Sequence, residues 1–400
     1  MKSNLRGHIS VTSLQKVFDA VSASGRLRSL VLLAFGVFGV NFALGIYEST
    51  YTNFLVGDLN IDAFQIGALE SIREVPGLLS ALTLGSMLRF PQPLLAGFSL
   101  LVFSFGIGGI STVNSWAQAV LWSLTWSIGF HSWSPLSSSM TLGLSDQKKE
   151  GKRLGQVNSV ASIAGMIAMA SVTIFSSLMA MQYRLFFVAA GLVSTAGGLM
   201  VFRILPTAKT LEKPRFVFRR RYGVYYALNF LEGARRQIFL TFAPFALVKV
   251  YNLDVTMIAL LMFVSRALTF LSSPYLGRLV DRIGPRTMLS LSYVLMIGDL
   301  LGYTYIRNVP VLLALYLLNS VLMTVSMISR TTYINAISSS DDLTPSLAMG
   351  QTMDHIAAVT LPLAGGAFWA AFGYEATFLI GVAVAICLLI VTQRMQAFRA

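Results

Sequence analysis

Apolar runs of roughly 20 residues recur along almost the whole chain, each long enough to cross a bilayer as a helix, and they constrain the fold more than any other feature. Transmembrane barrel strands would instead give short segments of alternating polarity. Only 12% of the residues are charged, whereas about a quarter are charged in soluble domains. The sequence therefore predicts an all-α polytopic membrane protein.

The apolar runs divide into twelve predicted transmembrane spans: 29–54, 63–88, 92–112, 116–143, 155–181, 185–204, 223–248, 255–277, 287–306, 309–335, 350–371 and 375–393. A basic segment near the midpoint separates spans six and seven. We therefore expect two six-helix bundles (29–204 and 223–393), a basic cytoplasmic linker (205–222), a cytoplasmic N-terminal segment (1–28) and a cytoplasmic tail (394–400). Leu14, Val17, Phe18 and Val21 share one helical face, which predicts a short amphipathic helix on the membrane surface, with a disordered tail as the alternative.

Lysine and arginine indicate how the chain lies in the membrane. If the N-terminus is inside, only Arg184, Lys249 and Arg307 fall in the loops on the outer side. Cytoplasmic loops carry an excess of Lys and Arg, so both termini are expected in the cytoplasm and the protein in the plasma membrane. The formal net charge of +13 then forms a rim that faces anionic lipid, and a nucleic-acid partner is not expected.

Short sequences of the first half recur in the second half in the same order. NIDAFQIGAL (60–69) aligns without gaps with NLDVTMIALL (252–261), and NFALG (41–45) with NFLEG (229–233). Ser145, Asp146, Gly155 and Gln156 likewise match Ser340, Asp341, Gly350 and Gln351. Two similar helical bundles with a site between them are a recurring plan of secondary transporters.

The loop GRLVDRIGPR (277–286), between spans eight and nine, resembles the conserved loop of the major facilitator superfamily. The matching residues are Gly277, Leu279, Asp281, Arg282, Gly284 and Arg286. The resemblance implies a loop that latches the inner ends of the helices and is released when the protein changes conformation. Asp281 is expected to accept hydrogen bonds at a neighbouring helix N-terminus. The first-half counterpart, GSMLRFPQP (85–93), lacks the acidic residue, and the marks of the drug-exporter subfamilies are missing, so no subfamily is identified.

Charged side chains stand inside several predicted spans. Glu70, Arg73 and Glu74 share one helical face in span two. The same holds for Glu232, Arg235 and Arg236 in span seven, and other spans add Glu48, His131, Arg266, Arg330, Asp354 and His355.

Each charge costs roughly 2.5–3.5 kcal/mol at the centre of a membrane helix. We therefore expect these side chains to face one another or water in a central cavity, as a substrate or ion path. The resemblance implies that spans three, six, nine and twelve stand outside that cavity. Asp299, toward the outer end of span nine, is expected to reach the membrane interface. Pairs within one helix, Glu70 with Arg73 or Glu232 with Arg236, could instead serve only to neutralise each other.

Three roles are proposed for these side chains as hypotheses. The arginines, first Arg73, Arg235 and Arg236, would bind an anionic group of the substrate, because guanidinium pairs bidentately with carboxylate or phosphate. A carboxylate, one of Glu70, Glu74, Glu232 and Asp354, would carry a coupling proton. His355 would titrate near neutral pH, although a buried, hydrogen-bonded histidine is the commoner interpretation for it and for His131.

These observations together predict a secondary active transporter that moves a small charged or zwitterionic organic solute by alternating access. Proton coupling is an expectation that comes from the family resemblance. An exporter of amphipathic drugs or lipids is the first alternative, and a non-transporting receptor the second. The chain has no G-K-[ST] phosphate loop, H-E-x-x-H pair or G-x-S-x-G elbow, so we expect no enzyme, no ATP, no metal and no cofactor. The expected partners are the solute, protons and membrane lipids, and the protein is expected to be a monomer.

Overall fold

The computed structural model describes residues 11–87, 90–145, 150–179, 182–205 and 218–396. Within these ranges the regular structure consists of twelve α-helices and two single-turn 3-10 helices, without a strand. The helices are α1 (Val11–Gly57), α2 (Ala63–Met87), α3 (Gln92–Gly109), α4 (Trp116–Gly143), α5 (Glu150–Met179), α6 (Tyr183–Val201), α7 (Gly223–Lys249), α8 (Val255–Ile283), α9 (Pro285–Tyr305), α10 (Val309–Ile337), α11 (Ser340–Phe372) and α12 (Tyr374–Thr392). The predicted all-α polytopic fold is confirmed.

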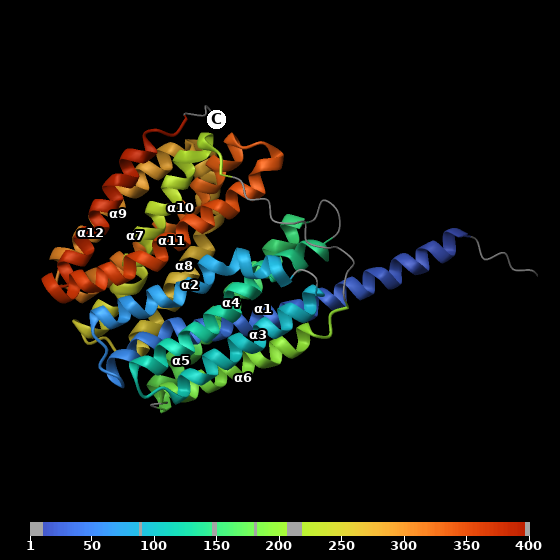
Figure 1. Cartoon of the computed structure of the whole chain (residues 1–400), viewed down its shortest axis with the longest axis horizontal. Coiled ribbons are helices and arrows are strands. Elements are labelled where there is room, and N and C mark those ends of the chain that lie inside the picture. The colour runs from blue at the N-terminus through green and yellow to red at the C-terminus, as the bar shows by residue number, and fades with distance from the viewer. Residues whose placement is uncertain (1–10, 88–89, 146–149, 180–181, 206–217, 397–400) are drawn as a thin grey trace, which may run out of the picture.

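The N-terminal part of α1 differs from the sequence prediction. The helix runs unbroken from Val11 to Gly57 and projects beyond the bundle, so residues 14–21 are not a separate surface helix (Figure 1). The side chains of residues 11–24 are outside the described part, and the predicted amphipathic face among them stays a prediction.

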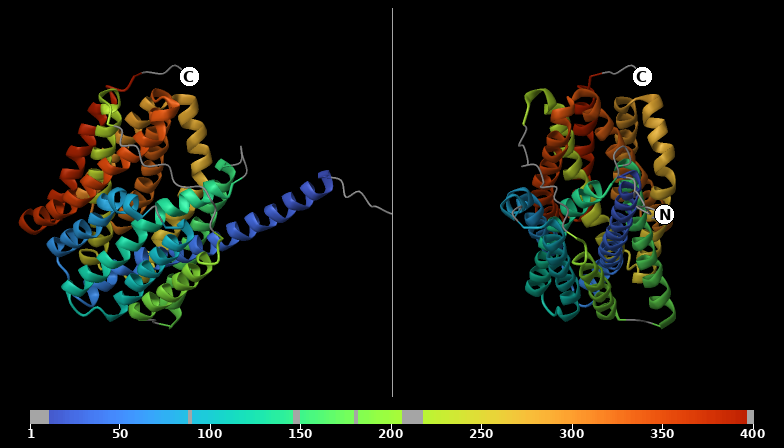
Figure 2. Two further views of the ribbon diagram at one scale, coloured as in Figure 1. Left: turned by 45° about the vertical axis from the view of Figure 1, so that its right-hand side comes forward. Right: turned by 90° about the vertical axis from the view of Figure 1, so that its right-hand side faces the viewer.

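Helices α1–α6 form one bundle and helices α7–α12 form a second one beside it (Figure 1). The bundles meet closely at one end and diverge toward the other, as the turned views in Figure 2 show. We name the diverging end the termini face, because α1 approaches the bundle there and α12 ends there. We name the other end the closed face.

The repeat seen in the sequence has a matching local geometry. Asn60 and Asn252 are the only non-glycine residues with positive φ in the described chain, at 49° and 56°. Asparagine tolerates this left-handed conformation better than most residues. Two residues further on, Asp62 and Asp254 cap α2 and α8 through hydrogen bonds of 2.8 Å from the backbone N–H of Gln65 and Met257. Both halves therefore enter their second helix by the same turn, as the aligned sequences predict.

Backbone contacts join the two bundles at the closed face. A Cβ atom on Gly67 of α2 would overlap the backbone carbonyl oxygen of Pro362 in α11. A Cβ on Gly366 would likewise overlap the carbonyl of Ala63. Glycine at these two positions lets the helix backbones touch, which is how membrane helices pack without a hydrophobic driving force.

Two hydrogen bonds between the bundles reinforce this closure. Asn53 donates to the carbonyl of Leu253 over 2.9 Å, and Lys249 donates to the side-chain oxygen of Asn60 over 2.7 Å. Asn60, which makes the positive-φ turn, thus also accepts a hydrogen bond that joins the two bundles.

The outer helices carry the apolar side chains that would meet lipid. Helices α3, α6, α9 and α12 expose large hydrophobic residues, among them Phe98, Phe105, Leu192, Leu199, Leu291 and Ile390. Nine helices of the described chain are long and apolar enough to cross a membrane, and α2, α4 and α7 are the three long helices that do not qualify. Helices α2 and α7 carry the charged stripes and α4 is rich in serine, and these polar side chains lower the mean hydropathy of the three helices.

A charged cluster ties the segment before α7 to the start of α11 at the termini face. Arg219 Nε and Arg221 Nη2 lie 2.8 and 2.6 Å from one carboxylate oxygen of Asp342, and the Tyr222 hydroxyl donates to the same oxygen over 3.0 Å. Burial of the carboxylate opposes its ionisation, but the hydrogen bonds from Tyr222 and the two arginines outweigh burial and lower the pKa of Asp342.

Candidate functional site

A cavity of about 1630 Å³ lies between the two bundles. Its lining comes from α1, α2, α4 and α5 of the first bundle and α7, α8, α10 and α11 of the second. No lining residue belongs to α3, α6, α9 or α12, so the predicted division into inner and outer helices is confirmed for the described residues. Toward the termini face the lining reaches Ser138, Gly155, Pro274 and Ala348. The inter-bundle contacts at Gly67 and Gly366 close the opposite end.

Five of the predicted residues form a compact cluster where α2 meets α4 and α11. Arg73 pairs with both of its α2 neighbours: its Nε lies 3.0 Å from Glu70 Oε2, and its Nη2 lies 2.8 Å from Glu74 Oε1. The other Glu74 oxygen lies 3.1 Å from Nδ1 of His355 in α11. The His355 ring meets the His131 ring edge to face, with 5.0 Å between the ring centres.

This cluster, which we call the Glu74 cluster, holds two carboxylates against one arginine. The side chains of Arg73, Glu70 and Glu74 are 15%, 14% and 8% exposed, so water screens their charges little. His355 of α11 lies beside this surplus negative charge. Since Glu74 belongs to the first bundle and His355 to the second, their contact joins the two halves.

Gly77 explains how two imidazoles fit against α2. A Cβ atom at Gly77 would lie 2.7 Å from Cε1 of both His131 and His355. Glycine one turn after Glu74 therefore makes the space that both rings occupy. The Trp126 ring completes the wall, with the Arg73 guanidinium 5.2 Å from its centre.

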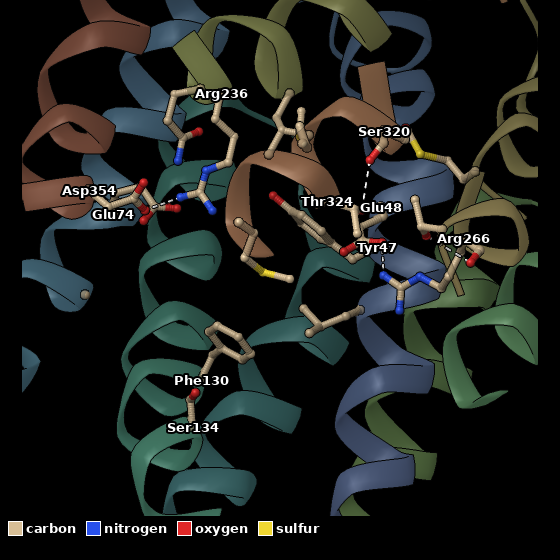
Figure 3. A pocket seen from close by; sticks show the side chains of 18 of the residues that line it. Tyr47, Glu48, Glu74, Phe130, Ser134, Arg236, Arg266, Ser320, Thr324 and Asp354 are labelled. Atoms are coloured by element: carbon tan, nitrogen blue, oxygen red, sulfur yellow. Dashed lines mark hydrogen bonds and ion pairs between the residues drawn. The ribbon is translucent and has the colours of Figure 1, made fainter. Parts of the chain in front are cut away.

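Two more ion pairs line the cavity. Arg236 of α7 pairs with Asp354 of α11, so this pair is internal to the second bundle. Arg266 of α8 lies 2.8 Å from Glu48 of α1, so that pair crosses between the bundles. Figure 3 shows Arg236 and Asp354 at one side of the pocket and Glu48 and Arg266 at the other.

Three predicted residues lie behind the cavity wall instead of lining it. Arg235 is fully buried and pairs with Glu232 over 2.7 Å within α7. It also donates to Asn319, whose amide donates to Asp299 over 2.5 Å. The Arg330 guanidinium donates to Asn229.

These placements correct two expectations. Glu232 pairs with Arg235 rather than with Arg236, because consecutive residues point about 100° apart around a helix. Asp299 is 1% exposed within the second bundle and does not reach the interface; Asn319 of α10 donates to one of its carboxylate oxygens there. Glu232, Arg235 and Asp299 therefore form a buried polar network that holds α7, α9 and α10 together.

The loop between α8 and α9 makes the sharp turn that its glycine predicts. Gly284 has a φ of 92°, which suits glycine, and Pro285 is the first residue of α9. Asp281 and Arg282 are exposed, and no hydrogen bond joins Asp281 to a described residue, so the predicted acceptor role at a helix N-terminus is not seen in this conformation. Arg286 donates to Gln393 over 3.3 Å, and Gly277 has open space around it.

The uncharged part of the lining was not among the residues predicted from the sequence. Hydroxyl and aromatic side chains cover much of the cavity wall, including Tyr47, Tyr51, Phe130, Ser134, Ser320 and Thr324. The serine-rich run SWSPLSSS (132–139) in span four was the available signal, because membrane helices bury hydroxyls only where they find partners or water. Within the described chain, no three His, Cys, Asp or Glu side chains form a group that could hold a metal ion.

Comparison with known proteins agrees with this arrangement. The family profile described as the Major Facilitator Superfamily matches residues 225–395, and structures of that family superpose on nearly the whole chain. The C-terminal half of the chain therefore matches the major facilitator superfamily, and the whole chain has that transporter fold. It is an integral membrane protein with a transporter fold, and the family indicates a transporter rather than an enzyme, with a small-molecule substrate. No curated protein matches the sequence.

Three solved structures illustrate the superfamily fold. A mutant of the nucleoside transporter NupG has a TM-score of 0.78 and 13% identity, covering 92% of this chain and 100% of its own. A bacterial homologue of the human lysosomal transporter Spinster, inward-facing and occupied, has a TM-score of 0.73 and 15% identity, covering 92% and 97%. The human organic anion transporter MFSD10 has a TM-score of 0.61 and 13% identity, covering 92% and 99%. At these identities the likeness shows the shared fold.

Proposed function

We propose that the protein is a secondary active transporter that moves a small charged or zwitterionic organic solute across the cytoplasmic membrane by alternating access. The termini face would be the cytoplasmic one, in keeping with the distribution of lysine and arginine. The observation that carries the proposal is the cavity of about 1630 Å³, which both bundles line with paired arginine and carboxylate side chains. A purely structural interface would have no use for half-exposed charges between two lipid-embedded bundles.

Alternating access is supported by the unequal contacts at the two ends of the cavity. At the closed face the bundles touch through backbone and through hydrogen bonds, among them those that Asn53 and Lys249 donate. At the termini face the bundles diverge (Figure 2). Rocking of one bundle against the other would exchange these two arrangements around the same charged wall.

A polar organic solute is the substrate class that the solved structures of the same fold make us expect. The comparison structures are titled as a nucleoside transporter and an organic anion transporter. Tyr47, Phe130, Ser320 and Thr324 offer aromatic faces and hydroxyls in the same space (Figure 3). A solute with a polar or heteroaromatic body and at least one charge fits this lining best.

For the coupling proton, the proposal assigns the Glu74–His355 contact. It joins the bundles, so a change in its protonation would alter the free energy of holding them together. The charged and titratable groups that face it are Arg73 and Glu70 on α2, His131 on α4, and the Arg236–Asp354 pair near by on α7 and α11. A proton shared between Glu74 and His355 would strengthen the contact as an ion pair, and its loss would weaken it.

Counterflow in proteoliposomes tests the proposed function. Solutes that raise the melting temperature of the purified protein are first chosen from charged metabolites, nucleosides, hydrophobic cations and lipids. Each of these solutes is then trapped inside vesicles, and uptake of its labelled form is measured with and without a pH gradient. Counterflow of a polar charged solute, increased by the gradient, is the expected result.

Three outcomes contradict the proposal in different ways. Counterflow of hydrophobic cations alone would favour an exporter of amphipathic compounds. Binding of solutes without any counterflow would favour a receptor. Uptake that is indifferent to the pH gradient would remove the proton from the mechanism and leave transport in place.

A further inference from the structure

Exposure separates the ion pairs of the cavity into two kinds. The Glu74 cluster is mostly buried, with side chains 8–15% exposed. Arg236 is 36% exposed, Arg266 26% and Glu48 39%. These three side chains therefore present their charges to the contents of the cavity, whereas the charged groups of the Glu74 cluster mostly contact one another.

The hydrogen-bond donors of Arg236 are mostly unused. A guanidinium has five N–H donors, and Arg236 makes one hydrogen bond to the described residues, to Asp354. Its Nε is buried without a partner. Arg266 is in a similar position, with one hydrogen bond to Glu48. By contrast, Arg235 uses all three of its nitrogen atoms in the buried network.

The overall charge of the cavity limits what can bind there. Outside the Glu74 cluster, two arginines and two carboxylates line it as the pairs Arg236–Asp354 and Arg266–Glu48, so this part of the wall is already neutral. A purely anionic or purely cationic ligand would leave one more charge without an opposite partner in a poorly solvated space, which is costly. A ligand with one charge of each sign adds none.

We infer that the solute is a zwitterion, with its anionic group on the Arg236 guanidinium and its cationic group on the Glu48 carboxylate. This inference rests on the proposed transport function and narrows its substrate class. The two anchors lie at opposite sides of the pocket, with Tyr47 and Thr324 between them (Figure 3). They also belong to different bundles, Glu48 to the first and Arg236 to the second. A bound zwitterion would therefore bridge the two halves.

A matched peptide series tests the inference by binding alone. The probes are tyrosine, Ala-Tyr and Ala-Ala-Tyr, each in the free form, as the C-terminal amide and as the N-acetyl derivative. The amide removes the negative charge and the acetyl group removes the positive one, while the body stays the same. Binding is measured by thermal shift and isothermal titration. The free forms should bind at least roughly tenfold more tightly than both derivatives, with a best length in the series.

Two variants assign the ends of the ligand. Arg236→Gln should reduce binding of the free peptide to the level of its amide, and Glu48→Gln should reduce it to the level of the acetyl derivative. Arg307→Gln and Glu375→Gln are the matched controls, because that pair has a similar length of 2.7 Å but lies outside the cavity. Both controls should bind like the unmodified protein.

The outcomes separate this inference from the proposed function. Equal or tighter binding of the amides or acetyl derivatives overturns the zwitterion assignment, and so does a lack of binding by all free forms. Loss of binding in the Arg307 and Glu375 controls as well would show that the effect is not local to the cavity, which also overturns it. Binding of the free peptides without counterflow supports the site and refutes transport.

Discussion

Replacing Gly67 with alanine should shift the protein away from the conformation described above. The new Cβ overlaps the backbone carbonyl oxygen of Pro362, and a backbone atom cannot rotate aside as a side chain would. Helices α2 and α11 must therefore move apart at the closed face. Overpacking of this kind costs about 1–3 kcal/mol. If the cost falls on this conformation alone, the equilibrium with a conformation open at that face shifts roughly 5- to 150-fold.

The shift can be measured as the distance between two spin labels by pulsed electron–electron double resonance. The labels would be attached at Asp58→Cys and Val250→Cys, both exposed at the closed face, in a Cys387→Ser background. Gly67→Ala should increase the population with the longer distance. Gly366→Ala should act in the same direction, because its Cβ overlaps the carbonyl of Ala63.

The control for these changes is Gly298→Ala in α9, where the added Cβ meets no atom within 4 Å. This variant should give the distance distribution of the unmodified protein. Unchanged distributions in both Gly67→Ala and Gly366→Ala, with folding intact by size-exclusion chromatography, would refute the idea that these backbone contacts hold the face shut.

Three further predictions concern the charged groups. His355→Gln and Glu74→Gln should each abolish accumulation driven by a pH gradient but retain counterflow, and accumulation that survives both changes would exclude this pair as the proton site. Glu232→Gln leaves Arg235 buried without its charged partner, so it should lower the free energy of unfolding by about 3–5 kcal/mol. Arg307→Gln, at the exposed pair with Glu375, should lower it by only about 0–1 kcal/mol. Denaturant titration in detergent distinguishes the two variants, and equal effects would show that the Arg235 network is not stabilising. The pKa of Asp342 is lowered in the folded state. Its stabilising effect is therefore complete above the unfolded pKa of about 3.9 and is lost as pH falls through the folded value. The melting temperatures of Asp342→Asn and the unmodified protein should differ at neutral pH and converge in acid, and a constant difference would contradict the assignment.

Much of the fold was predictable because hydrophobic length and charge placement are local properties of the sequence. The apolar runs predicted the helices, and the aligned NIDAFQIGAL and NLDVTMIALL segments predicted the matching turns at Asn60 and Asn252. Charges inside spans two and seven predicted that these helices face inward, since lipid would not accept them.

Pairing between charges could not be predicted in the same way. Glu74 and His355 lie 281 positions apart, and only the packing of α2 against α11 brings them together. Arg235 and Arg236 are adjacent in sequence and identical in chemistry, yet one joins a buried network and the other lines the cavity. The side of α7 that each side chain takes depends on how the helix is rotated against its neighbours, and the periodicity of one helix does not determine that rotation.

Access to the cavity from both sides of the membrane tests the central claim most directly. Ser320 lines the cavity and is labelled in Figure 3, so Ser320→Cys in the Cys387→Ser background gives a single reactive thiol there. A membrane-impermeant maleimide is applied from either side of oriented proteoliposomes, with and without the best-binding solute. If access alternates, the maleimide should label Ser320→Cys from both sides, and the bound solute should slow the labelling. Labelling from the termini face alone, under every condition, would contradict alternating access.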